Sequence, residues 1–88
     1  MDTLQKMKLE ILTPEQLVFS GEVSLVTVPG TSGRFTILEN HAPIISSLTK
    51  GVITYREKDM DVHLTVKDGF VEVSNNMISI AVEGVTYE

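Results

Sequence analysis

The sequence contains no cysteine, and this absence excludes several kinds of chemistry at once. Without thiols the chain cannot form a disulfide, a thiolate zinc site or a cysteine nucleophile. Basic residues are also few, since seven Lys and Arg against twelve Asp and Glu give a formal net charge of −5. They do not cluster along the chain. The sequence therefore argues against nucleic-acid binding, which requires basic residues to neutralise phosphates.

Long apolar runs are missing as well. No run approaches the ~18 residues that a membrane-spanning helix needs, so we expect no direct membrane insertion. The N-terminal stretch MDTLQKMKLEIL lacks the charged leader and long apolar core of a signal peptide. The chain has 88 residues, of which 42% are hydrophobic. This length and composition predict one globular domain over residues 1–88.

Alternation of apolar and polar residues is the dominant pattern in the chain. It is clearest over residues 7–12, 61–68 and 77–83, where every second residue is apolar. Weaker patterns predict further strands at 16–20, 23–28, 34–38, 44–48, 52–57 and 69–73. Turn signals separate them at 13-TPE-15, 20-SG-21, 29-PGTSG-33, 57-EKDMD-61, 68-DG-69 and 74-SNN-76. With no helical repeat, the pattern predicts an all-β fold, a compact β-sandwich of about eight to ten short, mostly antiparallel strands.

Some apolar residues break the alternation. Val71 and Val73 share one face of their strand, which places Phe70 on the other face with Glu72. Val52 and Met77 are out of phase in the same way. Such residues on adjacent strands would form an exposed apolar patch for a protein partner. The alternative is that loops cover both faces of the sheets.

Glu39 and His41 are the residues that first suggest catalysis or metal binding. A metal would need further ligands converging on the same point, and the sequence has only one other histidine, His63, on a different predicted strand. A serine nucleophile would need an oriented base and an oxyanion loop, which do not accompany Ser46. We expect no catalytic residue and no metal site. The simpler interpretation is that His41 bonds to the backbone and shapes a bend that Pro43 fixes.

The two glycines of the stretch 29-PGTSG-33 raise the question of whether it is a phosphate-binding loop. It lacks the GxxxxGK[ST] pattern, and no helix follows to supply an N-terminal dipole. We therefore expect no cofactor or nucleotide there, and interpret the stretch as a projecting β-turn with Arg34 at its edge. Projecting loops on rigid scaffolds are common contact sites.

Three segments in order resemble the epsilon subunit of bacterial F-type ATP synthase, which is called delta in mitochondria. They are 11-ILTPEQLVFSGEV-23, 33-GRFTILENHAP-43 and 67-KDGFVEVSNNMISI-80. The likeness extends from about residue 6 to residue 83. The chain departs from the family pattern at Thr36, where glycine is usual, at Glu39, where proline is frequent, and at Asp68, where many members have a second glycine.

The resemblance implies a non-catalytic subunit of the central stalk that ties the gamma subunit to the membrane ring of c subunits. Proton-driven rotation would thereby be coupled to ATP synthesis. It implies a peripheral location at the cytoplasmic face of the inner (plasma) membrane, as part of F1. Most members continue into two Ala-rich helices that inhibit ATP hydrolysis and in some members bind ATP. This sequence ends before them, so neither property is expected here.

The resemblance also implies two groups of contact residues. The loop facing the c-ring would contain Gly30, Thr31, Ser32, Gly33 and Arg34. The side facing gamma would contain Thr13, His41, Ala42, Pro43 and Ser46, and periodicity alone adds Phe70 to that side. Two rival interpretations remain from the residues: a free-standing β-sandwich module that binds a peptide or small ligand, and a metal-dependent enzyme that uses Glu39 and His41.

Overall fold

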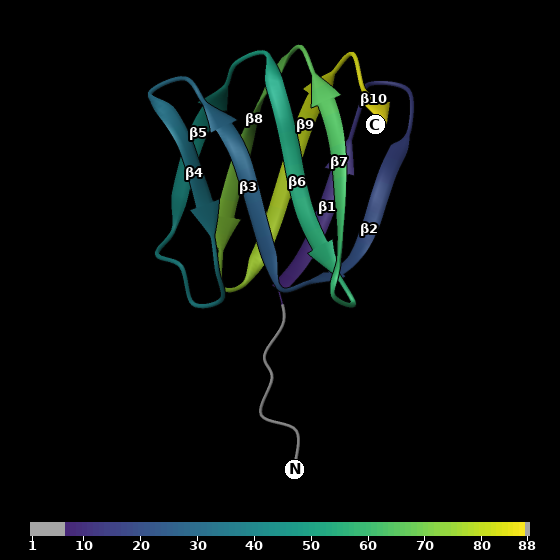
Figure 1. Ribbon diagram of the computed structural model, residues 1–88. Helices are drawn as coiled ribbons and strands as arrows, with labels where there is room; N and C mark the ends of the chain where they lie inside the picture. Colours follow the sequence, from purple (N-terminus) through teal and green to yellow (C-terminus); the bar gives the residue numbers. More distant parts are fainter. Residues whose placement is uncertain (1–6, 88) are drawn as a thin grey trace.

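Ten strands make up the part of the protein that the structure describes (Figure 1). The structure is a computed structural model that describes residues 7–87. In chain order the strands are β1 (Met7–Leu12), β2 (Leu17–Val23), β3 (Leu25–Gly30), β4 (Gly33–Ile37), β5 (Ile44–Leu48), β6 (Gly51–Glu57), β7 (Met60–Val66), β8 (Asp68–Ser74), β9 (Met77–Glu83) and β10 (Thr86–Tyr87). Over this range there is no helix with the length and apolar content that crossing a membrane requires.

The strands form one hydrogen-bonded sheet that folds over itself into two layers. Their order is β10-β7-β6-β3-β5-β8-β9-β1-β2, and β4 pairs with the outer side of β3. The sheet turns its corner between β3 and β5, which are joined only through Gly30 and Leu48. Figure 1 shows β3, β6 and β7 in front of β8, β9 and β1. All pairs are antiparallel except β1 with β9, so the predicted all-β sandwich is confirmed.

Alternating side chains from both layers build the core. In β1 the buried residues are Met7, Leu9 and Ile11, and the last two are in register with Ile78 and Ile80 of β9. Each fully buried aliphatic side chain contributes about 1.5–3 kcal/mol relative to its exposed state. Within residues 7–87 no polar or charged residue is buried. The core of the described residues is therefore apolar throughout, apart from the hydroxyl group of Tyr55.

The strands predicted from alternation are all present, with bounds that differ by a few residues. Two predicted turns are wrong, however. The Ser-Gly pair ending at Gly21 lies inside β2, and the Asp-Gly pair ending at Gly69 lies inside β8. The chain bends instead at Ser24 and at Lys67.

Close packing explains why these glycines belong to strands. A Cβ atom on Gly21 would lie 2.9 Å from the ring of Phe19. One on Gly69 would overlap the carbonyl oxygen of Ala81 on the neighbouring strand. Glycine within a strand often marks such a close approach rather than a turn. The two-residue strand β10 was not predicted, because so short a segment carries no periodic signal.

Aromatic residues close the open side of the sandwich between β2 and the front layer. The rings of Phe19 and Tyr55 lie 4.3 Å apart between centroids, tilted by 32°. The Tyr87 hydroxyl donates to the Val18 carbonyl at 3.4 Å and so links β10 to β2. Burial raises the pKa of Tyr55 to about 12, and Tyr87 and then Glu57 add to the rise.

This shift predicts that stability falls in alkaline solution. An unfolded tyrosine ionises near pH 10, whereas Tyr55 in the folded protein holds its proton to about pH 12. Between these values the unfolded chain binds fewer protons, so the free energy of unfolding decreases as pH rises. We expect Tyr55→Phe to make this decrease less steep. Urea unfolding at several pH values from about 9 to 12, a range that includes the interval between the two pKa values, measures it. Parallel pH profiles for the two proteins would contradict it.

Candidate partner-binding surfaces

The outer face of the rear layer carries exposed apolar side chains on neighbouring strands. Phe70 of β8 lies beside Ala81 of β9, and Ala81 lies beside Leu12 of β1. Leu12 is in turn paired with Leu17 of β2. Ile45 of β5 is diagonal to Phe70 on the same face. We call these five residues the apolar row.

Phe70 is exposed, as the periodicity of its strand predicted. The exposed fractions are 57% for Phe70, 52% for Leu17 and 73% for Ile45. Contiguous exposed apolar residues on a soluble domain usually mark a contact site. Met77, the second out-of-phase residue, is also exposed on the rear layer, whereas Val52 is half-buried on the front layer. The out-of-phase residues of the rear layer are thus exposed as an apolar patch would be, whereas Val52 is partly covered.

A shallow hollow of about 550 Å³ lies beside the middle of the apolar row. Phe70 and Leu12 line it on either side of Ala81, and Thr13 and Pro14 extend it beyond the end of β1. Asp68 and Glu83 also line it, together with Gly69 and Val82. The hollow therefore joins two predicted contact residues, Thr13 and Phe70, in one surface with an acidic border.

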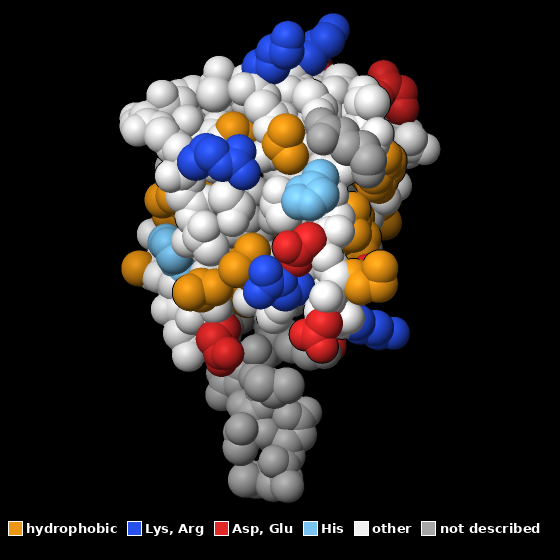
Figure 2. All heavy atoms as spheres, viewed as in Figure 1, with side chains coloured by type: hydrophobic (Ala, Val, Ile, Leu, Met, Phe, Trp, Pro, Cys, Tyr) orange, Lys and Arg blue, Asp and Glu red, His pale blue; other side chains and the backbone are white. Residues whose placement is uncertain are grey.

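The outer face of the front layer is polar by comparison. Side-chain hydrogen bonds of 2.8–2.9 Å join Thr27 with Thr36, Thr54 with His63, and Arg56 with Asp61. The hydrogen bond within the last pair raises the pKa of Arg56 and lowers that of Asp61. Figure 2 shows this face, on which hydrophobic side chains are scattered between charged ones of both signs. These polar groups satisfy one another and offer no apolar surface comparable to the row.

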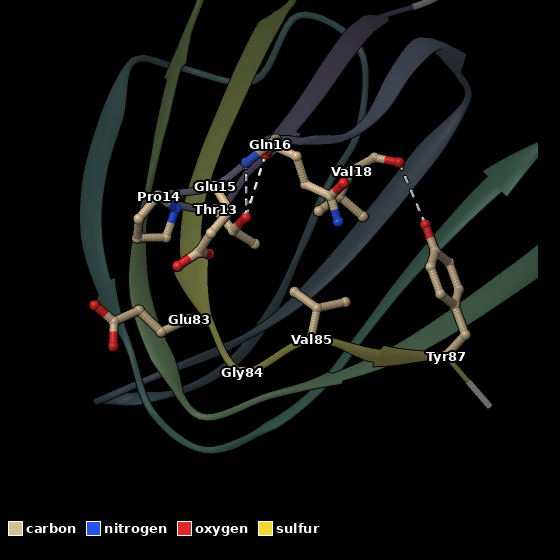
Figure 3. A pocket seen from close by; sticks show the side chains of 9 residues that line it. All are labelled: Thr13, Pro14, Glu15, Gln16, Val18, Glu83, Gly84, Val85 and Tyr87. Carbon is tan, nitrogen blue, oxygen red and sulfur yellow. Dashed lines mark hydrogen bonds between the residues drawn. The ribbon is translucent and has the colours of Figure 1, made fainter.

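The loop after β1 borders a second hollow, of about 540 Å³ (Figure 3). The Thr13 hydroxyl accepts from the Gln16 amide at 3.2 Å and lies 3.3 Å from the Gln16 carbonyl, so it is engaged within its own loop. Across the hollow, Val85 points inward and Tyr87 bridges to Val18. Thr13 thus shapes the loop, and its contribution to a partner surface is the position of that loop.

The predicted ring-facing loop, residues 30–34, is the hairpin between β3 and β4. Its base is anchored to β5, because the Thr31 amide donates to the Ser47 carbonyl at 3.1 Å and their hydroxyls lie 2.8 Å apart. Ser32 and Gly33 form the exposed tip. Arg34 folds back over β3, where its Nη1 donates to the Val52 carbonyl of β6 at 2.9 Å. The loop is therefore a firmly held projection.

The bend that contains His41 lies at the other end of the sandwich. The His41 amide donates to the Leu38 carbonyl at 3.1 Å, and its Nδ1 lies 2.7 Å from the Ala42 carbonyl. The predicted bond from His41 to the backbone is thereby confirmed. Thr36 has no positive φ, as its replacement of glycine predicted. Glu39 is exposed beside this bend.

Two asparagines hold this bend in place, and sequence reasoning missed their role. The Asn40 amide donates to Asn76 Oδ1 at 2.5 Å, and Asn76 Nδ2 donates to Asn40 Oδ1 at 3.2 Å. Both residues have positive φ, of 65° and 59°. The predicted turn at 74-SNN-76 hinted at Asn76, but nothing in the sequence links it to a residue 36 positions earlier.

We expect Asn76→Ala to loosen the bend without unfolding the sandwich. The substitution removes two side-chain hydrogen bonds and places alanine at a positive φ, where it is strained. Together these effects should lower the local stability of the bend by about 1–3 kcal/mol. Hydrogen exchange should accelerate at the His41 amide and remain slow in β9. The control is Asn75→Ala, which has a similar φ of 52° but no such bond to Asn40. Equal acceleration of the His41 amide in both variants would contradict the role of Asn76.

The predicted contact residues thus fall into two groups at opposite ends of β9. Leu12, just before Thr13, is level with Ala81 near the end of β9, whereas Asn76, which touches the bend, precedes its start. Gly30 is level with Leu48, which is level with Gly69, so the ring-facing loop shares the end of Thr13. Figure 1 shows the two ends at the top and bottom of the view.

Ser46 and the pair Glu39–His41 complete the predicted residues. Ser46 is paired with buried Val71 and is half-buried on the inward side of β5, where its hydroxyl donates to the Ser47 carbonyl at 3.1 Å. No group of three or more His, Asp or Glu residues within 7–87 converges as a metal site would require.

Known proteins are similar to this chain in sequence and in fold. The family model described as ATP synthase, Delta/Epsilon chain, beta-sandwich domain matches residues 6–87. The ATP synthase epsilon chain of Magnetococcus marinus is 44% identical over 79 residues, which cover 90% of this chain and 58% of that protein. The epsilon chain of Leptospira interrogans is 41% identical over 75 residues, covering 85% and 59%. The chain thus spans less than two thirds of the length of these relatives.

Two solved structures have the same fold at low sequence identity. A chain of the Euglena gracilis mitochondrial ATP synthase (OSCP/F1/c-ring) matches with a TM-score of 0.88 at 14% identity, over 93% of this chain and 53% of that chain. One from the central stalk and c-ring of the Tetrahymena thermophila mitochondrial enzyme matches with 0.80 at 20% identity, over 93% and 66%. With the family model matched from residue 6 to residue 87, this chain belongs to the beta-sandwich domain family of the ATP synthase delta and epsilon chains.

Proposed function

We propose that this chain acts as a non-catalytic part of the central stalk of an F-type ATP synthase. It ties the gamma subunit to the c-ring, so that proton-driven rotation reaches the catalytic head. The observation that carries this function is the apolar row, which leaves Phe70, Leu17 and Ile45 more than half exposed on an otherwise well-packed domain. Membership of the ATP synthase delta and epsilon chain family supports gamma as the partner for that surface.

Each predicted surface has its own role in this proposal. The apolar row and the bend at His41–Pro43 face gamma. The loop 30–34 faces the c-ring from the opposite end to the bend. Thr31 is bonded to Ser47, and Ser47 is the cross-strand neighbour of Phe70. A short chain of contacts therefore links the ring-facing loop to the gamma-facing row.

Stiffness is the mechanical property that such a role requires. A close-packed β-sandwich transmits strain with little compression, and the core here is apolar among the described residues apart from the Tyr55 hydroxyl. We place the chain as a peripheral subunit at the cytoplasmic face of the inner (plasma) membrane. It carries no catalytic residue of its own and acts without a cofactor, metal or nucleotide.

Binding measurements test this function directly. The purified chain should form a stable complex with gamma in size-exclusion chromatography and calorimetry, and the gamma complex should then bind detergent-solubilised c-ring. It should hydrolyse neither ATP nor a simple ester. Failure to bind gamma would favour the free-standing binding module. Hydrolysis that requires a metal and is lost in His41→Ala would favour the enzyme instead.

A further inference from the structure

The outer face of the rear layer has a shape that goes beyond a flat apolar patch. At its centre, β9 presents two small residues outward, Ser79 and Ala81, both half-buried. Larger residues stand on the strands to either side. The registers give two neighbouring cross-strand rows, Phe70–Ala81–Leu12 and Glu72–Ser79–Glu10. The result is a short valley over Ser79 and Ala81, with β8 and β1 as its two walls and the exposed Met77 at one end.

The width of this valley matches an α-helix. Adjacent strands lie about 4.8 Å apart, so the backbones of β8 and β1 are about 10 Å apart, and the apolar ridge of a helix can lie between the side chains that rise from them. An α-helix with its side chains is about 10–12 Å across. A helix lying along β9 would place apolar side chains over Ala81 and between Phe70 and Leu12, where the structure has its hollow of about 550 Å³.

The pairing of the strands disfavours an extended partner. β8 is hydrogen-bonded to β5 and β9, and β1 is hydrogen-bonded to β9 and β2. The backbone groups below the valley are thus already paired, and no strand can be added there. Strand addition needs an exposed sheet edge. The partner must attach through side chains, as an amphipathic helix does.

The charge of the valley walls specifies the partner further. Among described residues, those that point outward from the rear layer include one basic side chain, Lys8, and several acidic ones. The acidic ones are Glu10, Glu22, Asp68, Glu72 and Glu83. Glu72 and Glu10 stand on opposite walls, level with Ser79. A helix in the valley would have both of its flanks beside carboxylates.

We propose that the valley receives an amphipathic helix of the gamma subunit that carries Lys or Arg on both flanks of its apolar ridge. The helix lies along β9, with the ridge over Ala81 and its basic flanks facing Glu72 and Glu10. This inference rests on the proposed function, because it takes gamma as the partner. It adds the element of gamma that binds, the direction in which it lies, and the charge that selects it.

Charge reversal on the two walls tests the inference. The double variant Glu10→Lys and Glu72→Lys should weaken binding of purified gamma by about tenfold or more at 50 mM NaCl, because like charges would face each other at short range. The matched control is Glu22→Lys, a reversal on the same layer that lies on edge strand β2, outside the valley. It should change the Kd by less than about threefold, because β2 lies beyond the β1 wall and Glu22 is therefore farther from a helix over β9 than Glu10 or Glu72. Wild-type affinity should fall as salt rises, and less so in the double variant.

Nuclear magnetic resonance locates the bound element. Addition of gamma to the labelled chain should shift the amide signals of β8, β9 and β1, with no new hydrogen-exchange protection on the edge strands β2 and β4. Equal effects of the double variant and Glu22→Lys would overturn the inference, as would new protection along an edge strand. Both results leave gamma binding itself intact. If the wild-type chain does not bind gamma, the proposed function and this inference fall together.

Discussion

Replacing Phe70 with aspartate is expected to weaken binding to gamma by about 30-fold or more while the sandwich remains folded. Aromatic residues at the centre of an interface typically contribute 2 kcal/mol or more, which corresponds to that factor. Phe70 occupies such a position, because Ile45 and Leu12 flank it on either side along the apolar row. The substitution also adds a carboxylate next to Glu72, in a desolvated contact where a buried charge is unfavourable.

The fold should tolerate this change because Phe70 contributes little to the core. Its side chain is 57% exposed and points away from Val71 and Val73, which are buried. Calorimetry with gamma measures the loss of affinity, and urea unfolding measures any loss of stability. Met60→Asp is the control, since Met60 is 70% exposed on β7 in the other layer. Equal losses of affinity in the two variants would mean that the apolar row is not the gamma surface.

Periodicity predicted the position of Phe70 but not that of its neighbours. In 69-GFVEV-73 the alternation is unambiguous, so Val71 and Val73 assign Phe70 to the outside. Ile45 follows another apolar residue, Ile44, and the sequence alone does not say which of the two faces inward. The alternation in 7–12 places Leu12 outward, but it does not say which strand lies beside Leu12. Only the strand registers decide that question. The apolar row as a surface could not be predicted for that reason.

Contacts between distant segments were beyond the reach of the sequence for a related reason. The parallel pairing of β1 with β9 joins residues about seventy positions apart, and it places Leu12 beside Ala81. The Asn40–Asn76 contact joins two predicted loops. Local propensity indicates that each loop bends, but it carries no information about which loops meet. The resemblance to the ATP synthase family supplied candidate residues, and the fold sorted them into two ends and one face.

Glycines gave the clearest error in sequence reasoning, because two physical causes produce the same residue. Glycine is favoured at turns that need positive φ, and also wherever a neighbouring backbone leaves no room for a Cβ atom. Gly69 has a positive φ of +152° and is also paired with Val82 inside β8, where a Cβ atom would overlap the Ala81 carbonyl oxygen, so both causes act at this position. The close approach at Gly69 also sets the position of β8 against β9, and Phe70 is the next residue of β8. Packing at Gly69 and contact at Phe70 are therefore coupled.

We expect Gly69→Ala to lower the free energy of unfolding by about 3 kcal/mol or more. The new Cβ would overlap the Ala81 carbonyl oxygen and lie 2.8 Å from both Cα and Cγ1 of Val82. Two of these three obstacles are backbone atoms, which cannot rotate away. Relief requires β8 and β9 to separate, and small domains have only about 5–15 kcal/mol of total stability.

Gly33→Ala provides the matched control at the tip of the loop 30–34. Gly33 has φ +129°, so alanine is strained there, but no atom lies within 4 Å of the new Cβ. Its expected cost is the conformational part alone, about 1 kcal/mol. Urea unfolding should therefore separate the two variants by about 2 kcal/mol or more. Similar costs would show that backbone conformation, not contact between β8 and β9, sets the requirement for glycine. Packing of Gly69 against β9 would then not be what sets the position of Phe70 beside the valley.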